Sequence, residues 1–250
     1  MSGGRPPAFA VSAGNFFFRH RNLLFPVVFA FLFIVSSPDN LFTESPLEEA
    51  LEKAAVVLVL LGQAFRLAVI GFAYIKRGGK EGKVFAEKLV VRGFYAHTRN
   101  PMYVGNALIV LGFCILYESW FSYLVVLPFF LFAYYSIVVA EETYLSTRFG
   151  PEYDDYVKKV NRFIPDFRGL KASLSEFRYD WKRALRKDYG NITVAVAMLL
   201  VVGLRKSIGS ASEFPSTRAN AFFLGLALTV LFYSLVRYLK KTGRLASPNG

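Results

Sequence analysis

Cysteine, histidine and charged residues are scarce in this chain of 250 residues. The single cysteine, Cys114, excludes an intrachain disulfide, and with only 2 histidines a metal site is not expected. Charged residues make up 19% of the chain, below the roughly 25% that is usual in soluble domains. The motifs GxSxG, HExxH and the P-loop are missing, and no GxGxxG joins a strand to a helix, so a soluble Rossmann-type nucleotide domain has no support.

Apolar residues are abundant instead, and they come in blocks. Hydrophobic residues make up 54% of the chain, aromatic residues 17%, and the mean hydropathy is +0.37. These values predict an integral membrane protein. The net charge of +12 would also suit a nucleic-acid partner, but the basic residues lie beside the apolar blocks, as in the cytoplasmic loops of membrane proteins. We therefore expect membrane lipids, and no nucleic acid, as partners.

Six apolar blocks predict an all-α, polytopic membrane protein with about six transmembrane helices. The first block follows a charged start and is short, which also resembles a signal peptide, but SSPDN after it matches a cleavage site poorly and we expect a retained helix. Only YESW separates the third block from the fourth, which predicts an antiparallel hairpin whose second arm is kinked at Pro128. The blocks are residues 23–35, 54–75, 102–116, 121–140, 192–204 and 221–236.

Flanking charges predict the topology. Basic and non-basic loops alternate, which puts both termini, segment 76–100 and segment 141–190 on the cytoplasmic side. Arg205, Lys206 and Arg218 lie between the last two blocks and break this pattern.

Four regions follow from the blocks. We expect an N-terminal region with the first helix at 1–53 and a membrane core at 54–167. The basic and aromatic segment 168–190 suits either a helix on an anionic membrane surface or a solvated linker. A hairpin of two helices with a basic tail, 191–250, is expected to serve packing or oligomerisation, and the oligomeric state does not follow from the sequence.

The stretch HTRNPMYVG, residues 97–105, places polar residues directly before an apolar block. Asn100 and Pro101 predict a helix start, with the asparagine capping free amides and the proline at the first helical position. A cap with a snorkelling Arg99 is one interpretation. In the other, the helix N-terminus and the donors of Arg99 bind the anionic end of a cofactor at the membrane surface.

Two further clusters are candidate sites. Glu141 and Glu142 leave the membrane at the open end of the same hairpin as Arg99, so they are either a solvated helix end or partners in a cofactor site. Gln63 and Arg66 share a face of the 54–75 helix. An arginine within a membrane span is expected either to receive an anionic substrate group or to form a structural ion pair.

The core resembles the superfamily of isoprenylcysteine carboxyl methyltransferases and phospholipid methyltransferases over roughly residues 54–165. That pattern reads G-x-Y-x-x-x-R-H-P-x-Y-x-G, a hairpin, E-E-x-x-L, F-G-x-E-Y-x-x-Y and a closing proline, and the LGQAFR stretch resembles the arginine-bearing helix before it. Asn100 stands where the family has histidine, which puts any imidazole role in doubt. The matching residues are Gly93, Tyr95, Arg99, Pro101, Tyr103, Gly105, Glu141, Glu142, Leu145, Phe149, Gly150, Glu152, Tyr153, Tyr156 and Pro165.

The resemblance implies S-adenosylmethionine at the cytoplasmic surface and a lipophilic methyl acceptor, either an isoprenylcysteine-type carboxylate or a lipid amine, arriving from the bilayer. Arg99 and the amides near Pro101 and Met102 would hold the cofactor carboxylate, and the glutamates would meet its amine, ribose or adenine. The residues implied in catalysis are Arg66, Arg99 and Glu142. The cofactor-binding residues implied are Tyr95, His97, Arg99, Asn100, Pro101, Met102, Tyr103, Glu141 and Glu142.

Two alternatives stay open. Sterol-type reductases that use NADPH share a similar arginine–histidine–proline motif, but they usually carry a tryptophan before the final tyrosine of the second motif, where this chain has YDDY. The other alternative is a non-catalytic membrane relative, to which Asn100 gives some weight.

Overall fold

Helices make up nearly all of the regular structure. The chain is described by a computed structural model, which covers residues 6–39, 46–72, 77–80, 83–86, 88–210 and 216–246. The helices are α1 (Ala8–Val35), α2 (Pro46–Phe72), α3 (Pro101–Tyr117), α4 (Leu127–Phe149), α5 (Pro151–Lys159), α6 (Leu170–Ser175), α7 (Trp181–Ser210) and α8 (Ser216–Lys241).

Short irregular elements connect them. The strands β1 (Arg77–Lys80) and β2 (Lys83–Ala86) form one antiparallel ribbon. A 3₁₀ turn at Gly93–Ala96 precedes α3, and a π-helical turn at Ser122–Val126 leads into α4.

Five helices in the described part of the chain, α1, α2, α4 with its preceding turn, α7 and α8, are long and apolar enough to cross a bilayer. The sixth, α3, is apolar and has 17 residues. The expected all-α, polytopic membrane fold is therefore confirmed, and the chain is an integral membrane protein. The predicted second span ended at 75, and its last three residues lie outside the described ranges.

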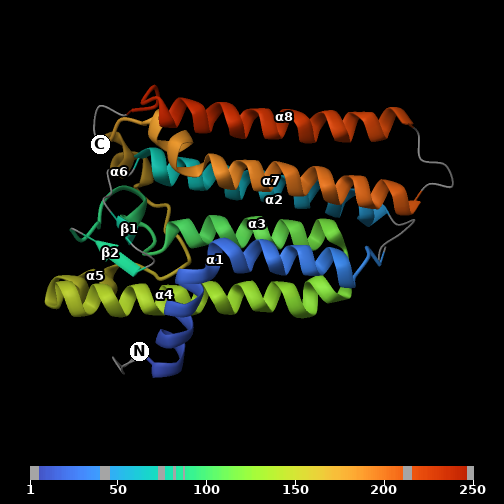
Figure 1. Cartoon of the computed structure of the whole chain (residues 1–250). Helices are drawn as coiled ribbons and strands as arrows, with labels where there is room; N and C mark the ends of the chain where they lie inside the picture. The colour runs from blue at the N-terminus through green and yellow to red at the C-terminus, as the bar shows by residue number, and fades with distance from the viewer. Residues whose placement is uncertain are drawn as a thin grey trace.

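The first helix is longer than predicted. It begins at Ala8 rather than at residue 23, and it is 28 residues long. Its N-terminal half is held by packing, since the ring of Phe17 meets that of Phe129 in α4 edge-on at 5.8 Å. Pro26 lies inside the helix, and Figure 1 shows α1 changing direction along its length.

The long helices alternate in direction, so the start of α1 and the end of α8 lie at the same end of the bundle (Figure 1). The ribbon, α5 and α6 gather at the same end, which also holds the start of α3 and the end of α4. We call it the site end. Segments 76–100 and 141–190 thus share one end, as expected, and its cytoplasmic orientation stays a prediction.

Close backbone contact holds the centre of the bundle together. α2 packs along α3, α1 along α4, and α7 lies against both α2 and α8. A Cβ on Gly62 would lie 2.7 Å from the carbonyl oxygen of Gly105, and one on Gly112 would lie 2.7 Å from that of Ala55. Small residues at these positions let α2 and α3 approach backbone to backbone, as in other membrane helix pairs.

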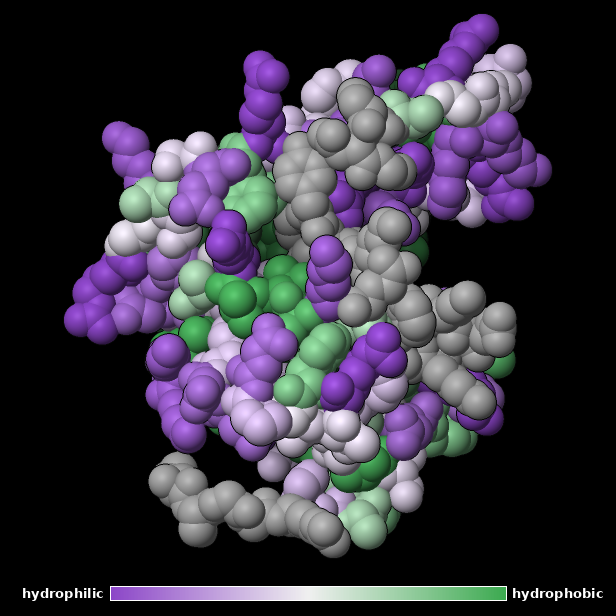
Figure 2. All heavy atoms as spheres, turned by 90° about the vertical axis from the view of Figure 1, so that its left-hand side faces the viewer, coloured by the Kyte–Doolittle hydropathy of each residue, from purple (hydrophilic) through white to green (hydrophobic). Residues whose placement is uncertain are grey.

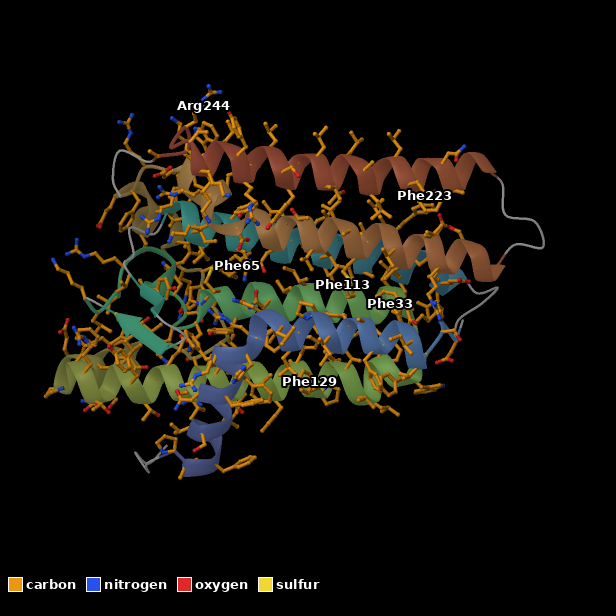
Figure 3. The ribbon with its side chains drawn as sticks, viewed as in Figure 1. Phe33, Phe65, Phe113, Phe129, Phe223 and Arg244 are labelled. Carbon is orange, nitrogen blue, oxygen red and sulfur yellow. The ribbon has the colours of Figure 1, made fainter. Side chains whose placement is uncertain are left out.

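Aromatic side chains fill the half of the bundle away from the site end. Phe33 lies edge-on to Tyr117 with ring centroids 5.3 Å apart, and Phe113 lies edge-on to Phe29 at 6.1 Å. Figure 3 shows Phe33 and Phe113 between the helices there.

The second arm of the hairpin adapts to Pro128 through the π-helical turn. Proline has no amide hydrogen to donate, and its ring clashes with the carbonyl one turn earlier in a regular α-helix. The wider turn at Ser122–Val126 comes directly before Pro128 and lets the helix continue past it.

Lys206, which disturbed the charge pattern, has acidic partners. Its Nζ lies 2.5 Å from Glu52 and 3.0 Å from Glu118, at the end of the bundle opposite the site end. Arg205 donates to the carbonyl oxygen of Ser36 at 3.1 Å. The charge of Lys206 is thus compensated inside the protein, and the side chain of Arg218 lies outside the described residues.

Segment 168–190 contains α6 and the first turns of α7. Asp180 starts α7, because its Oδ1 accepts the amide hydrogen of Arg183 at 2.9 Å, as an N-cap does. The helix then runs unbroken from Trp181 to Ser210. The basic first turns of α7 therefore continue directly into a membrane helix and form neither a separate surface helix nor a linker.

Replacing Gly112 by alanine is expected to destabilise the bundle. The added Cβ would meet a backbone oxygen, which no rotamer change relieves, and overpacking costs about 1–3 kcal/mol. Thermal unfolding followed by circular dichroism should show a lower midpoint, by about 2–4 °C per kcal/mol. Gly190→Ala is the matched control, since no atom lies within 4 Å of its added Cβ. An equal midpoint for the two variants would contradict the close-packing account.

Candidate functional site

The segment before α3 is fastened to the loop after α5. Thr98 is fully buried, and its hydroxyl lies 3.3 Å from the carbonyl oxygens of Arg162 and Phe163. The amide of Arg99 donates to the carbonyl oxygen of Asn161 at 2.8 Å. These bonds hold residues 97–100 against residues 161–166 at the site end.

Glu142, near the end of α4, is the centre of the polar contacts. Asn100 Nδ2 donates to its Oε1 at 3.0 Å, and Arg162 reaches its Oε2 with Nε at 3.0 Å and Nη2 at 2.8 Å. Arg99 Nε lies 3.4 Å from Oε1. A carboxylate that is 8% exposed is thereby surrounded by three donors from two loops.

Arg99 is buried but poorly satisfied. It is 8% exposed, and its Nε and Nη1 atoms have no hydrogen-bond partner among the described residues. The contact of Arg99 Nε with Glu142 at 3.4 Å is an ion pair and not a hydrogen bond. A guanidinium in this state is a ready receptor for an anionic group.

Arg162 was missed by the sequence reasoning, although it stands directly before the FIP that closes the second motif. Partial burial lowers the pKa of its guanidinium, but the charge and hydrogen bonds of Glu142 outweigh that effect and raise the pKa above its ordinary value. Arg162 therefore stays charged and offsets the charge of Glu142.

The neighbouring carboxylate and tyrosines complete the site. Tyr103 donates its hydroxyl hydrogen to Glu141 Oε1 at 2.8 Å, which ties the first turn of α3 to α4. The Tyr156 hydroxyl donates to the carbonyl oxygen of Tyr95 at 2.7 Å. Phe65 of α2 packs edge-on against Phe94 at 5.3 Å, close to this end of the bundle (Figure 3).

Asn100 does not cap α3 with its side chain, contrary to the prediction. Its carbonyl oxygen accepts the first amides of the helix, from Tyr103 at 3.1 Å and Val104 at 3.3 Å. The side-chain amide is instead drawn to Glu142, because a charged acceptor makes a stronger hydrogen bond than a neutral one. Pro101 is at the first helical position, as expected.

Two other predicted cofactor residues, His97 and Met102, make contacts outside this group of polar side chains. His97 contacts the carbonyl oxygen of Asp166 through Nδ1 and the hydroxyl of Ser173 through Nε2 at 2.9 Å. Met102 packs among the apolar residues around Val69 and Phe94. The structure thus brings together Arg99, Asn100, Tyr103, Glu141 and Glu142, while His97 secures the loop beside them.

Arg66 lies deeper in the bundle and is engaged by protein groups. It binds Asp188 of α7 through Nε at 3.1 Å and also through Nη2, and its Nη1 contacts Asn106 of α3. This geometry is the structural ion pair that was one of the two interpretations. Asp188 had no signal of its own in the sequence beyond being an acid beside an apolar run.

Comparisons with known proteins match the part of the chain that contains most of these residues. Residues 52–152 match the family model for phospholipid methyltransferases. The protein-S-isoprenylcysteine O-methyltransferase of Schizosaccharomyces pombe is 32% identical over 121 residues, which are 46% of this chain and 49% of that protein. The central part of the chain is thus similar to membrane methyltransferases of the phospholipid and isoprenylcysteine type. The chain spans about half of the length of that relative, 49%.

A second relative is named for metal resistance and not for methyl transfer. The cobalt-zinc-cadmium resistance protein CzcN of Cupriavidus metallidurans is 28% identical over 170 residues, which are 66% of this chain and 73% of that protein. No solved structure matches the chain significantly.

Glu142→Gln is expected to destabilise the site end. The change leaves two arginines beside a neutral group, and removing one partner of a buried ion pair costs about 3–5 kcal/mol. Unfolding can be followed with a maleimide dye, which reaches the buried thiol of Cys114 only when the bundle opens. Glu152→Gln, at an exposed position of α5, should change the midpoint little. Equal midpoints for both variants would show that Glu142 is not an organising residue.

Proposed function

We propose that this chain is an integral membrane methyltransferase that binds S-adenosylmethionine at the site end and methylates a lipophilic acceptor from the bilayer. Similarity to phospholipid and isoprenylcysteine methyltransferases supports the reaction class. The observation that carries the proposal is the buried guanidinium of Arg99 beside the start of α3, whose Nε and Nη1 atoms have no hydrogen-bond partner among the described residues.

The donors of Arg99 fit the carboxylate of such a cofactor. An arginine fork binds a carboxylate with two parallel hydrogen bonds, and buried donors without partners are costly until a ligand supplies them. The positive end of the α3 helix dipole lies next to Arg99 and favours the same anion. Asn100 and Arg162 both donate hydrogen bonds to Glu142. The Glu142 carboxylate therefore does not depend on Arg99 alone, and Arg99 can bind the cofactor carboxylate.

Glu141 and Glu142 supply acceptors for the cofactor's amine or ribose hydroxyls. A carboxylate has about four acceptor positions, so the hydrogen bond from Tyr103 does not saturate Glu141. Arg162 balances Glu142, which leaves the site with acceptors but little surplus negative charge.

Bound S-adenosylmethionine supplies an activated methyl group that an acceptor attacks in line. The protein residues then contribute orientation more than proton transfer. Arg99 lies just before α3, Tyr103 lies in the first turn of α3 and Glu141 lies in α4, and this frame would fix the cofactor at the membrane surface.

The surroundings of the site support a lipophilic acceptor. Figure 2 shows the site end as largely hydrophilic, with a hydrophobic area set among the polar groups near its centre. Ile164 and Phe167, in the loop after α5, are 78% and 55% exposed. Apolar surface at this level suits a lipophilic acceptor, and the engagement of Arg66 by Asp188 removes the support it gave to a carboxylate acceptor.

Arg99→Ala is expected to weaken binding of S-adenosylhomocysteine by about 10- to 100-fold, the value of hydrogen bonds to a charged group. Calorimetry on the purified protein in detergent measures it. Glu142 keeps Asn100 and Arg162 in this variant, so the fold should persist. Arg92→Ala is the control, because Arg92 is a 78% exposed arginine of the same loop.

The same preparations are then incubated with membrane lipid extract and a cofactor carrying a tritiated methyl group. A labelled lipid that forms with the parent chain and with Arg92→Ala, but poorly with Arg99→Ala, supports the proposal. Preferential binding of NADPH would instead indicate a reductase, and binding of neither cofactor would indicate a non-catalytic relative.

Asn100→His tests the departure from the family pattern. An imidazole N–H can replace the donor to Glu142, so methyl transfer should stay within about threefold of the parent, whereas Asn100→Ala should lose about tenfold because Glu142 loses a charge-assisted bond. Initial rates of methyl transfer, measured with labelled cofactor, compare the two variants with the parent. A large gain for Asn100→His would mean that the chain has drifted from the family's chemistry.

A further inference from the structure

Asp188 of α7 is the most heavily hydrogen-bonded carboxylate deep in the bundle. It is 1% exposed and accepts Gln63 Nε2 at 2.6 Å, Asn191 Nδ2 at 2.9 Å and Arg66 Nε at 3.1 Å, besides Arg66 Nη2. Two of these partners, Gln63 and Arg66, come from α2. A pair so fully enclosed has one geometry, because any displacement leaves a buried charge without its partner.

Arg66 transmits this geometry to α3. Its Nη1 contacts Asn106 Oδ1, and its Cγ lies where a Cβ on Gly105 would be 2.7 Å away. Asn106 is one turn beyond Tyr103, on the neighbouring surface of the same helix. The side chain of Arg66 therefore lies across the second turn of α3, directly behind the turn that carries the proposed cofactor site.

The helix that supplies Asp188 lies beyond the family core. The family match ends at residue 152, whereas α7 starts at Trp181. Arg66 in the matched segment thus takes its counter-charge from a helix outside that segment. An arginine within a membrane span is expensive without a partner, so α7 belongs to the working core.

We propose that Asp188 is a positioning residue for the methyl-transfer site, which it serves by holding Arg66 against Gly105 and Asn106 and so fixing the first two turns of α3. The inference rests on the proposed function for its effect on the cofactor. Its effect on α3 stands independently.

Asp188→Asn tests the proposal in the full-length protein in detergent. The side chain keeps its shape but loses its charge. We expect faster amide hydrogen exchange in residues 99–106 and at least tenfold weaker binding of S-adenosylhomocysteine. Glu118→Gln is the matched control, because Glu118 pairs Lys206 of α7 at the opposite end of the bundle and is also buried. It should loosen α7 without changing exchange at residues 99–106 or cofactor affinity.

A double variant separates positioning from stability. Arg66→Met with Asp188→Leu leaves no lone charge, so its unfolding midpoint should approach that of the parent. Affinity for S-adenosylhomocysteine should stay at least tenfold weaker, because the contact of Arg66 with Asn106 is gone. Recovery of affinity together with stability would reduce Asp188 to a structural role and overturn the proposal.

Hydrogen exchange tests the positioning role of Asp188, and the affinity of the parent chain tests the proposed function. Unchanged exchange at residues 99–106 in Asp188→Asn overturns the positioning role, whatever the cofactor data show. A parent chain that binds no S-adenosylhomocysteine defeats the proposed function, while the exchange experiment still decides whether Asp188 orders α3. Equal effects of Asp188→Asn and Glu118→Gln on both readouts also overturn the proposal.

Discussion

A carboxylate buried where a membrane helix ends is costly unless several donors surround it, and Glu142 meets that condition through residues distant in sequence. Arg99 and Asn100 approach it from the loop before α3, and Arg162 approaches it from the loop after α5. Because these groups come from two different loops, the carboxylate defines how the two loops face each other. The buried, incompletely satisfied Arg99 is a consequence of that arrangement, and it is the feature most suited to a ligand.

Buried charges with partners on other segments also fix the arrangement of helices inside the bundle. α7 is joined to the core by two charged contacts near its two ends, Asp188 with Arg66 and Lys206 with Glu52 and Glu118. Apolar packing alone does little to choose among helix arrangements in lipid, since lipid tails are as apolar as leucine. Paired charges and the close approaches at Gly62 and Gly112 select one arrangement, and with it the place of α3.

Much of the fold was predictable because a membrane helix is recognisable from a continuous run of apolar residues in the sequence. The apolar blocks identified six helices, and the loop charges placed 76–100 and 141–190 at one end, which the structure shows. The partners of polar side chains were less predictable. Asn100 was read as a cap because local rules favour that role, but Glu142 from α4 offered its amide a charged acceptor. Arg162 and Asp188 escaped notice because each acquires its meaning from a residue on another helix.

What the sequence determined by itself is the class of protein and the positions of its polar motifs, since hydropathy and short-range spacing depend only on neighbouring residues. The tertiary structure decided which of those residues meet. Tyr103 donates a hydrogen bond to Glu141, and His97 contacts Asp166 and Ser173. Arg66 pairs with Asp188, which is 122 positions further along the chain. Such pairings depend on how helices pack, because a buried charge is stabilised by whatever group the fold brings within hydrogen-bonding distance.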